Sequence, residues 1–152
     1  MPEQARRPPA GTVLAFDFGL QRIGVAVGEP ELGTAHPLPA LAALTQPGRM
    51  SAIGRLLKEW NPSLLVVGRP LGDDGAAHEM TRRAERFARQ LNGRFGLPVR
   101  LVDESYSSVE AESRVRAAYG RRRAAALARG KALDSQAAQL LLEQYFHDKQ
   151  AA

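Results

Sequence analysis

The amino-acid sequence predicts one α/β domain, in which a mixed five-stranded sheet has helices packed against its faces. Two short apolar runs, Thr12–Phe18 and Ile23–Gly28, flank a turn-like segment and predict an antiparallel hairpin. A third run, Ala35–Leu44, extends this hairpin, and segments of helical and strand-like periodicity then alternate along the chain. This order predicts a three-strand antiparallel meander followed by two strands parallel to the first.

The three later strand candidates differ in their expected positions. Ala35–Leu44 contains Pro37 and Pro39, and proline cannot donate to a sheet ladder, so we expect an edge strand. Leu64–Val67 is an uninterrupted apolar run, which is typical of a strand buried on both faces. Val99–Asp103 is the last predicted strand.

Apolar residues at helical spacing predict four helices around this sheet. The first ends at Asn61-Pro62, because proline cannot continue a helix. Ser107 and Glu110 fit the S-x-x-E capping box and predict the start of the third helix. In chain order, the predicted helices are Met50–Trp60, Met80–Phe95, Ser107–Tyr119 and Asp134–His147, with a polar loop at Arg69–Ala77.

Length and composition indicate a single globular unit. A chain of 152 residues can bury a sizeable core, and 44% hydrophobic with 24% charged residues is typical of globular proteins. We expect residues 1–10, which include Pro8 and Pro9, to form a flexible tail, and residues 11–148 to form the domain. The apolar runs fall far short of the roughly 18 residues of a membrane span, so no membrane partner is expected.

Cysteine is absent, which excludes disulfides and thiolate metal sites and fits a reducing compartment, so we expect a cytoplasmic protein. The net charge of +5 and an isoelectric point near 10.2 favour polyanionic partners. Residues 114–131 hold seven basic side chains and no acidic one. We call residues 114–131 the basic segment. Its basic residues are Arg114, Arg116, Arg121, Arg122, Arg123, Arg129 and Lys131. The alternative interpretation is a solvated loop with no binding role.

Asp17 is the first candidate for catalysis and metal binding. It closes the first strand, and alternation places it on the same face as Val13 and Ala15, where burying a carboxylate is costly without a cation. A turn residue beside Gly19 is the alternative interpretation.

Glu104 and Asp134 are the other two candidates. Glu104 directly follows a strand; Asp103 and Glu104 point to opposite sides, so only one of them is expected to join Asp17, and Glu104 is our choice. Asp134 begins the last helix on its apolar face. The alternatives are a solvated acidic pair at the strand end and an ordinary helix N-cap.

Together these three carboxylates predict a site for hard cations, Mg²⁺ or Mn²⁺. Two such ions roughly 3.5–4 Å apart can activate a water on one side of a phosphodiester and stabilise the departing oxygen on the other. The basic segment would then hold the nucleic-acid backbone. A phosphate loop is not supported, because Gly68 to Gly75 lacks the Gly-Lys-Ser/Thr ending. His36, His78 and His147 show no paired spacing and are interpreted as satisfied or exposed.

The sequence is similar to the YqgF/RuvX group of Holliday-junction-resolvase-like proteins and pre-16S ribosomal RNA nucleases. The similarity spans Val13 to Phe146. It rests on the segments Leu14-Ala15-Phe16-Asp17-Phe18-Gly19, Ile23-Gly24-Val25-Ala26-Val27-Gly28, Val66-Val67-Gly68-Arg69-Pro70-Leu71, Asp103-Glu104 and Asp134-Ser135-Gln136-Ala137-Ala138.

The resemblance implies a ribonuclease H-like fold and a Mg²⁺- or Mn²⁺-dependent phosphodiesterase site at Asp17, Glu104 and Asp134. It also implies cleavage that leaves a 5′-phosphate and a 3′-hydroxyl. The family usually has an arginine after Asp-Glu, where this chain has Ser105. Arg69, Arg100 or the cluster that begins at Arg121 would then have to position the phosphate.

The leading hypothesis is an endonuclease that matures the 5′ end of pre-16S ribosomal RNA. Holliday-junction cleavage on branched DNA is the alternative substrate assignment. A rival of another class is a non-catalytic nucleic-acid-binding ribosome-assembly factor, and a third is a sugar-kinase-like ATP-binding lobe. The expected partner is structured RNA or branched DNA, bound by a monomer or a homodimer.

Overall fold

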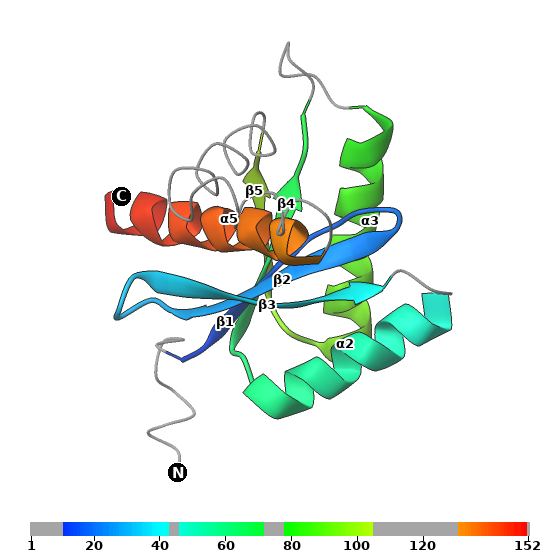
Figure 1. The fold of residues 1–152 in the computed structure, drawn as a ribbon, viewed down its shortest axis with the longest axis horizontal. Coiled ribbons are helices and arrows are strands. Elements are labelled where there is room, and N and C mark those ends of the chain that lie inside the picture. The colour runs from blue at the N-terminus through cyan, green and yellow to red at the C-terminus, as the bar shows by residue number, and fades with distance from the viewer. Residues whose placement is uncertain (1–10, 43–45, 72–77, 105–130, 152) are drawn as a thin grey trace.

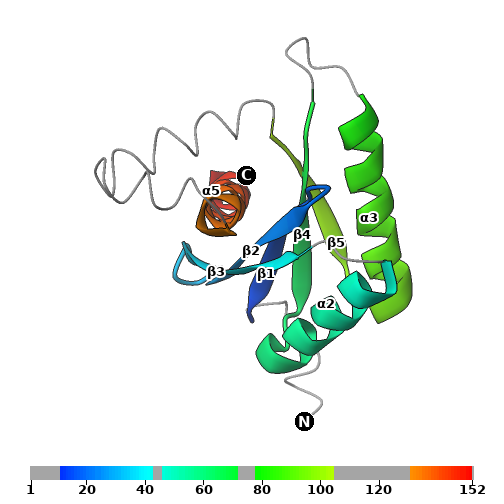
Figure 2. The same cartoon turned by 45° about the vertical axis from the view of Figure 1, so that its right-hand side comes forward.

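The computed structural model describes residues 11–42, 46–71, 78–104 and 131–151 (Figure 1). Within these residues one five-stranded sheet separates two helical layers, with α2 and α3 on one face and α5 on the other (Figure 2). None of the described helices is long and apolar enough to cross a membrane. The elements are β1 Val13–Asp17, β2 Arg22–Glu29, β3 Thr34–Ala42, α2 Gln46–Trp60, β4 Leu64–Arg69, α3 Glu79–Phe95, β5 Val99–Asp103 and α5 Lys131–Ala151.

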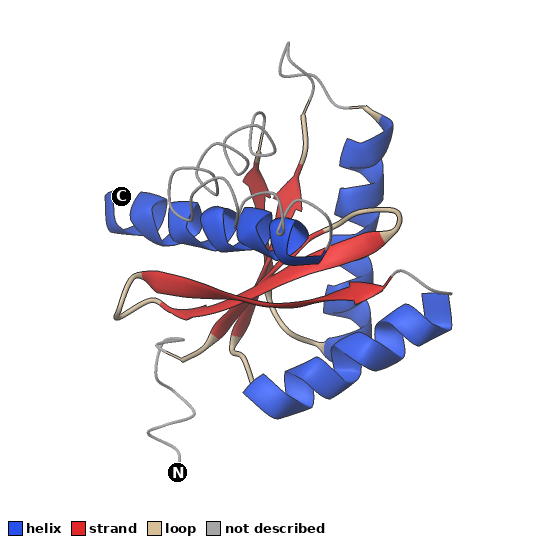
Figure 3. Cartoon of the chain, in the orientation of Figure 1, coloured by secondary structure: helices blue, strands red, loops and turns tan. Residues whose placement is uncertain are grey.

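The sheet has the strand order β3-β2-β1-β4-β5, which confirms the predicted mixed topology (Figure 3). The pairs β1–β2 and β2–β3 are antiparallel, whereas β1–β4 and β4–β5 are parallel. The strand that contains Pro37 and Pro39 lies at an edge, as the missing proline donors predicted. Because β1, β4 and β5 are parallel, their carboxyl ends share one edge of the sheet.

Strict alternation along β1 and β4 divides the core into two clusters, which is why both strands are almost continuously apolar. Leu14 and Phe16 pack with residues of α2 and α3, such as Ile53 and Phe87. On the other face of the sheet, residues of β1 and β4 pack against α5. They are Val13, Ala15, Leu64 and Val66, and their partners on α5 are Ala138, Leu141, Leu142 and Phe146. Asp17 follows Val13 and Ala15 in this alternation and therefore belongs to the α5 face.

The predicted helices differ from the observed ones mainly at their ends. His78, interpreted from the sequence as satisfied or exposed, is the N-cap of α3: its Nδ1 accepts from the Met80 N–H at 3.3 Å. Helix α5 is longer than predicted, and Phe146 is buried on it whereas Tyr145 is only half-buried. The reason is that Phe146 lies four residues after the buried Leu142 and so on the same face. The helix predicted at residues 107–119 lies outside the described residues.

Candidate functional site

Asp17 and Glu104 both lie at the shared carboxyl edge of β1, β4 and β5. Asp17 is the last residue of β1. The parallel register of β1 and β4 ends at Phe16 opposite Val67, so the next residues along the two strands are Asp17 and Gly68. Glu104 directly follows β5, and its N–H donates to the carbonyl of Arg69 at 3.1 Å. The two acidic residues therefore flank the end of β4.

Gly68 determines where the Glu104 carboxylate can lie. A methyl group at position 68 would place its carbon 2.6 Å from Oε1 and 2.9 Å from Oε2 of Glu104, so the carboxylate occupies the space above this glycine. Alternation from Leu64 and Val66 directs that space toward the α5 face, which is also the face of Asp17. Since neighbouring strands lie about 4.8 Å apart, the Glu104 carboxylate lies over the strand position next to Asp17.

Asp103 and Glu104, which are adjacent at the end of β5, differ in their exposure to solvent. Glu104 is 8% exposed, whereas the Asp103 side chain is 51% exposed. Asp103 points to the α3 side, where its Oδ1 lies 2.7 Å from Nη2 of Arg69, and Arg69 Nη1 lies 3.2 Å from Oε2 of Glu85. Glu104, not Asp103, thus faces the side on which Asp17 lies.

Arg69 was predicted to contact nucleic acid, but its guanidinium is shared between two carboxylates. Hydrogen bonds to Asp103 and Glu85 raise the pKa of Arg69 above its ordinary value, so the group stays charged at every physiological pH. Any phosphate contact made by Arg69 must compete with these two ion pairs. The arginine ties β4, β5 and α3 together at the edge that carries the acidic residues.

The first turn of α5 is anchored to the strands beside β1. Ser135 is buried, and its hydroxyl accepts from the N–H of Val25 at 3.4 Å and donates to the carbonyl of Leu38. Val25 and Leu38 are paired at the irregularity between β2 and β3, so the hydroxyl bridges the two strands at this interrupted point of the ladder. Val25 follows Gly24, the residue paired with Asp17.

This anchor places the backbone of Asp134, the residue before Ser135, at the start of α5 near the end of β1. The side chain of Asp134 lies outside the described part of the structure, as does that of Lys131, the first residue of α5. Four further residues predicted to bind nucleic acid, Arg121, Arg122, Arg123 and Arg129, fall in the undescribed range 105–130.

The donor set at this edge fits a hard divalent cation. Alternation along β1 places Asp17 on the α5 face, where the Glu104 carboxylate lies over Gly68, and carboxylate oxygens are the ligands that Mg²⁺ and Mn²⁺ prefer. Among the described side chains, no three histidine or acidic groups gather closely enough to hold an ion. A complete three-carboxylate site would need the side chain of Asp134.

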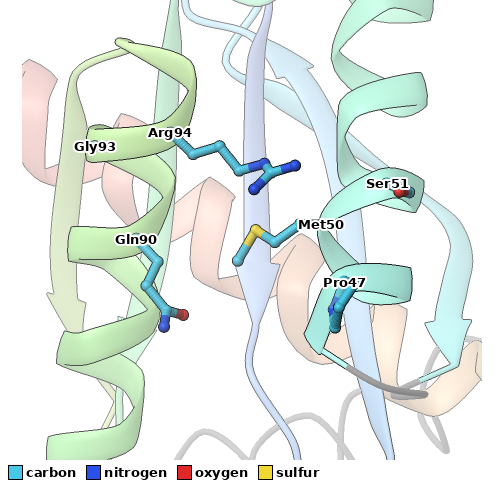
Figure 4. Close-up of a pocket in the computed structure, with 6 residues that line it drawn as sticks. All are labelled: Pro47, Met50, Ser51, Gln90, Gly93 and Arg94. Carbon is cyan, nitrogen blue, oxygen red and sulfur yellow. The ribbon is translucent and has the colours of Figure 1, made fainter.

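We call the carboxyl edge of the sheet that carries Asp17 and Glu104 the acidic edge. A cavity of about 490 Å³ lies between α2 and α3, away from this edge (Figure 4). The residues that line it carry no carboxylate; they are Pro47, Met50, Ser51, Gln90, Gly93 and Arg94. The cavity therefore offers no ligands for a hard cation, and the acidic edge is the better candidate site.

The fold is that of the ribonuclease H-like resolvases. The chain superimposes on Thermus thermophilus RuvC in complex with a Holliday junction substrate with a TM-score of 0.54 and 17% identity, over 91% of this chain and 96% of that chain. The fowlpox virus Holliday junction resolvase gives a TM-score of 0.56 and 13% identity, over 91% of this chain and 99% of that chain.

The family model of RuvX, described as Holliday junction resolvase, matches residues 11–148, and the chain belongs to this family. A relative from Nitrosospira multiformis is 48% identical over 149 residues, which cover 98% of this chain and 96% of the relative. A relative from Paraburkholderia phytofirmans is 50% identical over 140 residues, with 90% of each chain covered. Both relatives carry the name "Putative pre-16S rRNA nuclease".

The first prediction concerns the space above Gly68. Gly68→Ala should displace the Glu104 carboxylate and lower the free energy of unfolding by about 1–3 kcal/mol, because the added methyl overpacks a filled site. Denaturant unfolding and a crystal structure of the variant measure both effects. Gly93→Ala is the matched control, since nothing lies near its added methyl, and it should stabilise α3 by about 0.5–1 kcal/mol. An undisplaced Glu104 in the Gly68→Ala variant would contradict this interpretation.

The second prediction concerns the Ser135 hydroxyl. Ser135→Ala removes a partner from the Val25 N–H and the Leu38 carbonyl, which should lower the free energy of unfolding by about 1–3 kcal/mol. Amide hydrogen exchange at Val25 should accelerate more than exchange in α3. Ser51→Ala, at an exposed serine of α2, should change stability by less than about 0.5 kcal/mol. Unchanged exchange at Val25 would show that the hydroxyl does not bridge the strands.

Proposed function

We propose that this chain is a metal-dependent endonuclease that processes the 5′ end of pre-16S ribosomal RNA, with Asp17, Glu104 and Asp134 as its catalytic carboxylates. The observation that carries the proposal is the position of the Glu104 carboxylate over Gly68, beside Asp17 and on the α5 face. The names of relatives at 48% and 50% identity support the substrate assignment. A cytoplasmic location, where such precursors are matured, is part of the proposal.

Asp17, Glu104 and Asp134 would hold Mg²⁺ or Mn²⁺. When bound, such a cation supplies Lewis-acid stabilisation of phosphodiester oxygens, and two of them can serve the attacking and leaving oxygens. The chain itself contributes a rigid arrangement: Asp17 ends a strand buried on both faces, and Glu104 is fixed by its backbone bond to Arg69 and by the room above Gly68. Ligands held on strands keep their geometry better than ligands held on loops.

Two negative carboxylates on one face would by themselves repel a phosphodiester, because like charges in a poorly solvated site repel strongly. Divalent cations held by Asp17, Glu104 and Asp134 would offset this negative charge, so that a phosphate could approach. The carboxylates therefore act as cation ligands and as acceptors that orient the attacking water, rather than as direct phosphate contacts. The basic segment 114–131 is proposed to hold the nucleic-acid backbone on either side of the scissile bond.

A Holliday junction is the second candidate substrate, because the family description and the superimposed structures both refer to resolvases. Both candidates use the same phosphodiester chemistry, so the acidic edge is common to them. They differ in the shape of the nucleic acid that must be bound.

The third prediction tests the reaction. Purified protein with Mg²⁺ or Mn²⁺ should cleave structured RNA, and EDTA should abolish cleavage. Asp17→Asn, Glu104→Gln and Asp134→Asn should each lower the cleavage rate by about 100-fold or more, since changes beyond the ligands of a metal already cost roughly 10–100-fold. Asp103→Asn is the matched control: it is the neighbouring carboxylate, it faces Arg69 instead, and it should keep most of the activity.

Activity that survives Asp17→Asn or Glu104→Gln would refute the assigned site. Wild-type protein that binds RNA but cleaves neither RNA nor branched DNA would favour the rival assignment, a non-catalytic assembly factor. Circular dichroism of each variant establishes that the loss of activity is not a loss of fold.

The fourth prediction separates the two substrates. Depletion of the protein in its own cells should lengthen the 5′ end of the small-subunit ribosomal RNA, as measured by primer extension. In vitro, a transcript that spans the mature 5′ end should be cleaved faster than a four-way DNA junction at equal concentration. Normal 5′ ends after depletion, together with faster cleavage of the junction, would establish the resolvase assignment instead.

A further inference from the structure

On its solvent-facing side, helix α3 carries a line of arginines whose positive charge is not neutralised by the acidic residues of the helix. Arg82, Arg86 and Arg89 are all exposed and follow the i, i+4, i+7 spacing of one helix face. The opposite face of the helix, which holds Ala84, Phe87 and Leu91, is buried against the sheet; the three arginines thus occupy the outermost face, and we call them the arginine line.

The acidic residues of α3 do not neutralise the arginine line. Glu79 pairs with Arg83 at 3.0 Å, and Glu85 pairs with Arg69 at 3.2 Å. These are the two acidic residues of the helix. Within the described parts of the chain, no ion pair involves Arg82, Arg86 or Arg89. The helix therefore presents three positive charges on one side with no carboxylate paired to them there.

The arginine line begins at the edge that carries the acidic residues. The Thr81 hydroxyl donates to the carbonyl of Pro70, just after β4, and Glu85 is tied to Arg69 at the end of the same strand. The first turns of α3 are thus fixed where the parallel strands end. From there the helix runs toward the end of the sheet at which these strands begin (Figure 2). It lies on the sheet face opposite α5.

We propose that the arginine line binds the phosphate backbone of a double-stranded RNA segment flanking the cleavage site, an inference that rests on the proposed nuclease function. A helical rise of 1.5 Å per residue places Arg82 and Arg89 about 10 Å apart along the axis. Double-stranded DNA carries one phosphate charge per about 1.7 Å of its axis when both strands are counted, so a duplex of comparable charge density offers several phosphates over this length. Arginine suits this role because its planar fork binds phosphate oxygens in a bidentate manner.

The geometry connects this surface to the acidic edge. An RNA whose scissile phosphate lies at Asp17 and Glu104 on the α5 face would have to bend over the carboxyl edge of the sheet to place its flanking duplex on the solvent side of α3, which covers the opposite face. The basic segment 114–131 follows β5 in sequence and belongs to a different part of the chain. The arginine line would therefore hold backbone independently of that segment and fix the orientation of the duplex relative to the acidic edge.

The fifth prediction is the salt dependence of binding. Fluorescence anisotropy in EDTA, which prevents cleavage, measures binding of a labelled RNA hairpin over a range of salt concentrations. The variant Arg82→Gln/Arg86→Gln/Arg89→Gln should reduce the slope of log K against log salt by about 2–3 units, since each phosphate contact contributes about 0.9. Between about 50 and about 200 mM salt, the wild-type protein should lose affinity about 40-fold more than this variant.

The matched control is Arg55→Gln/Lys58→Gln/Arg94→Gln. It removes the same charge from exposed positions on α2 and at the far end of α3, and it should change the slope by less than one unit. Equal slopes for the two triple variants would overturn the proposal. A DNA duplex of the same sequence is a further probe: a slope change on both duplexes supports backbone recognition, whereas a change on DNA alone would overturn the assignment to RNA.

The same variants separate this inference from the proposed nuclease function. If the wild-type protein cleaves RNA and the Arg82, Arg86 and Arg89 substitutions leave the slope unchanged, the proposed duplex binding by the arginine line is refuted. The nuclease assignment is then unaffected. If these substitutions reduce the slope while Asp17→Asn and wild-type proteins both lack cleavage, the surface binds nucleic acid and the nuclease assignment fails.

Discussion

The arrangement of the site depends on one steric constraint, the absence of a side chain at Gly68. A buried carboxylate must lie where it can be compensated by charge or hydrogen bonds, because desolvation is costly. The end of β4 separates Asp17 on β1 from Glu104 after β5, and any side chain there would occupy the space into which the Glu104 carboxylate extends. A strand position without a Cβ is therefore what allows residues from two non-adjacent strands to share one face.

The alternation of the sheet gives its two faces different electrostatic environments at the same edge. Asp17 and Glu104 lie on the α5 side, whereas Asp103 lies on the α3 side and is neutralised by Arg69. Had Asp103 faced α5 as well, three carboxylates would repel one another within the described part of the site. Placing an arginine between Asp103 and Glu85 removes that repulsion and fixes α3 to β4.

Most of the fold could be predicted from the sequence because its elements have strong local periodicity. The prolines of β3 indicated an edge, and alternation at the end of β5 predicted that only one of Asp103 and Glu104 faces Asp17, but the burial of Glu104 is known only from the structure. The roles of Gly68 and Ser135 could not be predicted, because both depend on contacts between segments far apart in sequence: the residue numbers of Gly68 and Glu104 differ by 36, and those of Val25 and Ser135 differ by 110. The spacing of Arg82, Arg86 and Arg89 was visible in the sequence, but only the structure shows that the nearby glutamates pair with other arginines.

A nuclease with an acidic site faces opposing electrostatic requirements, and this chain satisfies them in separate places. The carboxylates needed to hold a cation repel the polyanion that must approach it, so attraction for the backbone has to come from outside the acidic face. A net charge of +5 provides a general attraction, but ions screen it beyond about 8–10 Å. Close approach therefore requires positive groups within that distance of the edge. The first turn of α3, which contains Arg82, is fixed to the end of β4 by the hydrogen bond from Thr81 to Pro70 and by the ion pair between Arg69 and Glu85. If the proposed arginine line binds the duplex, the ion pair that positions the helix also determines where the duplex is held.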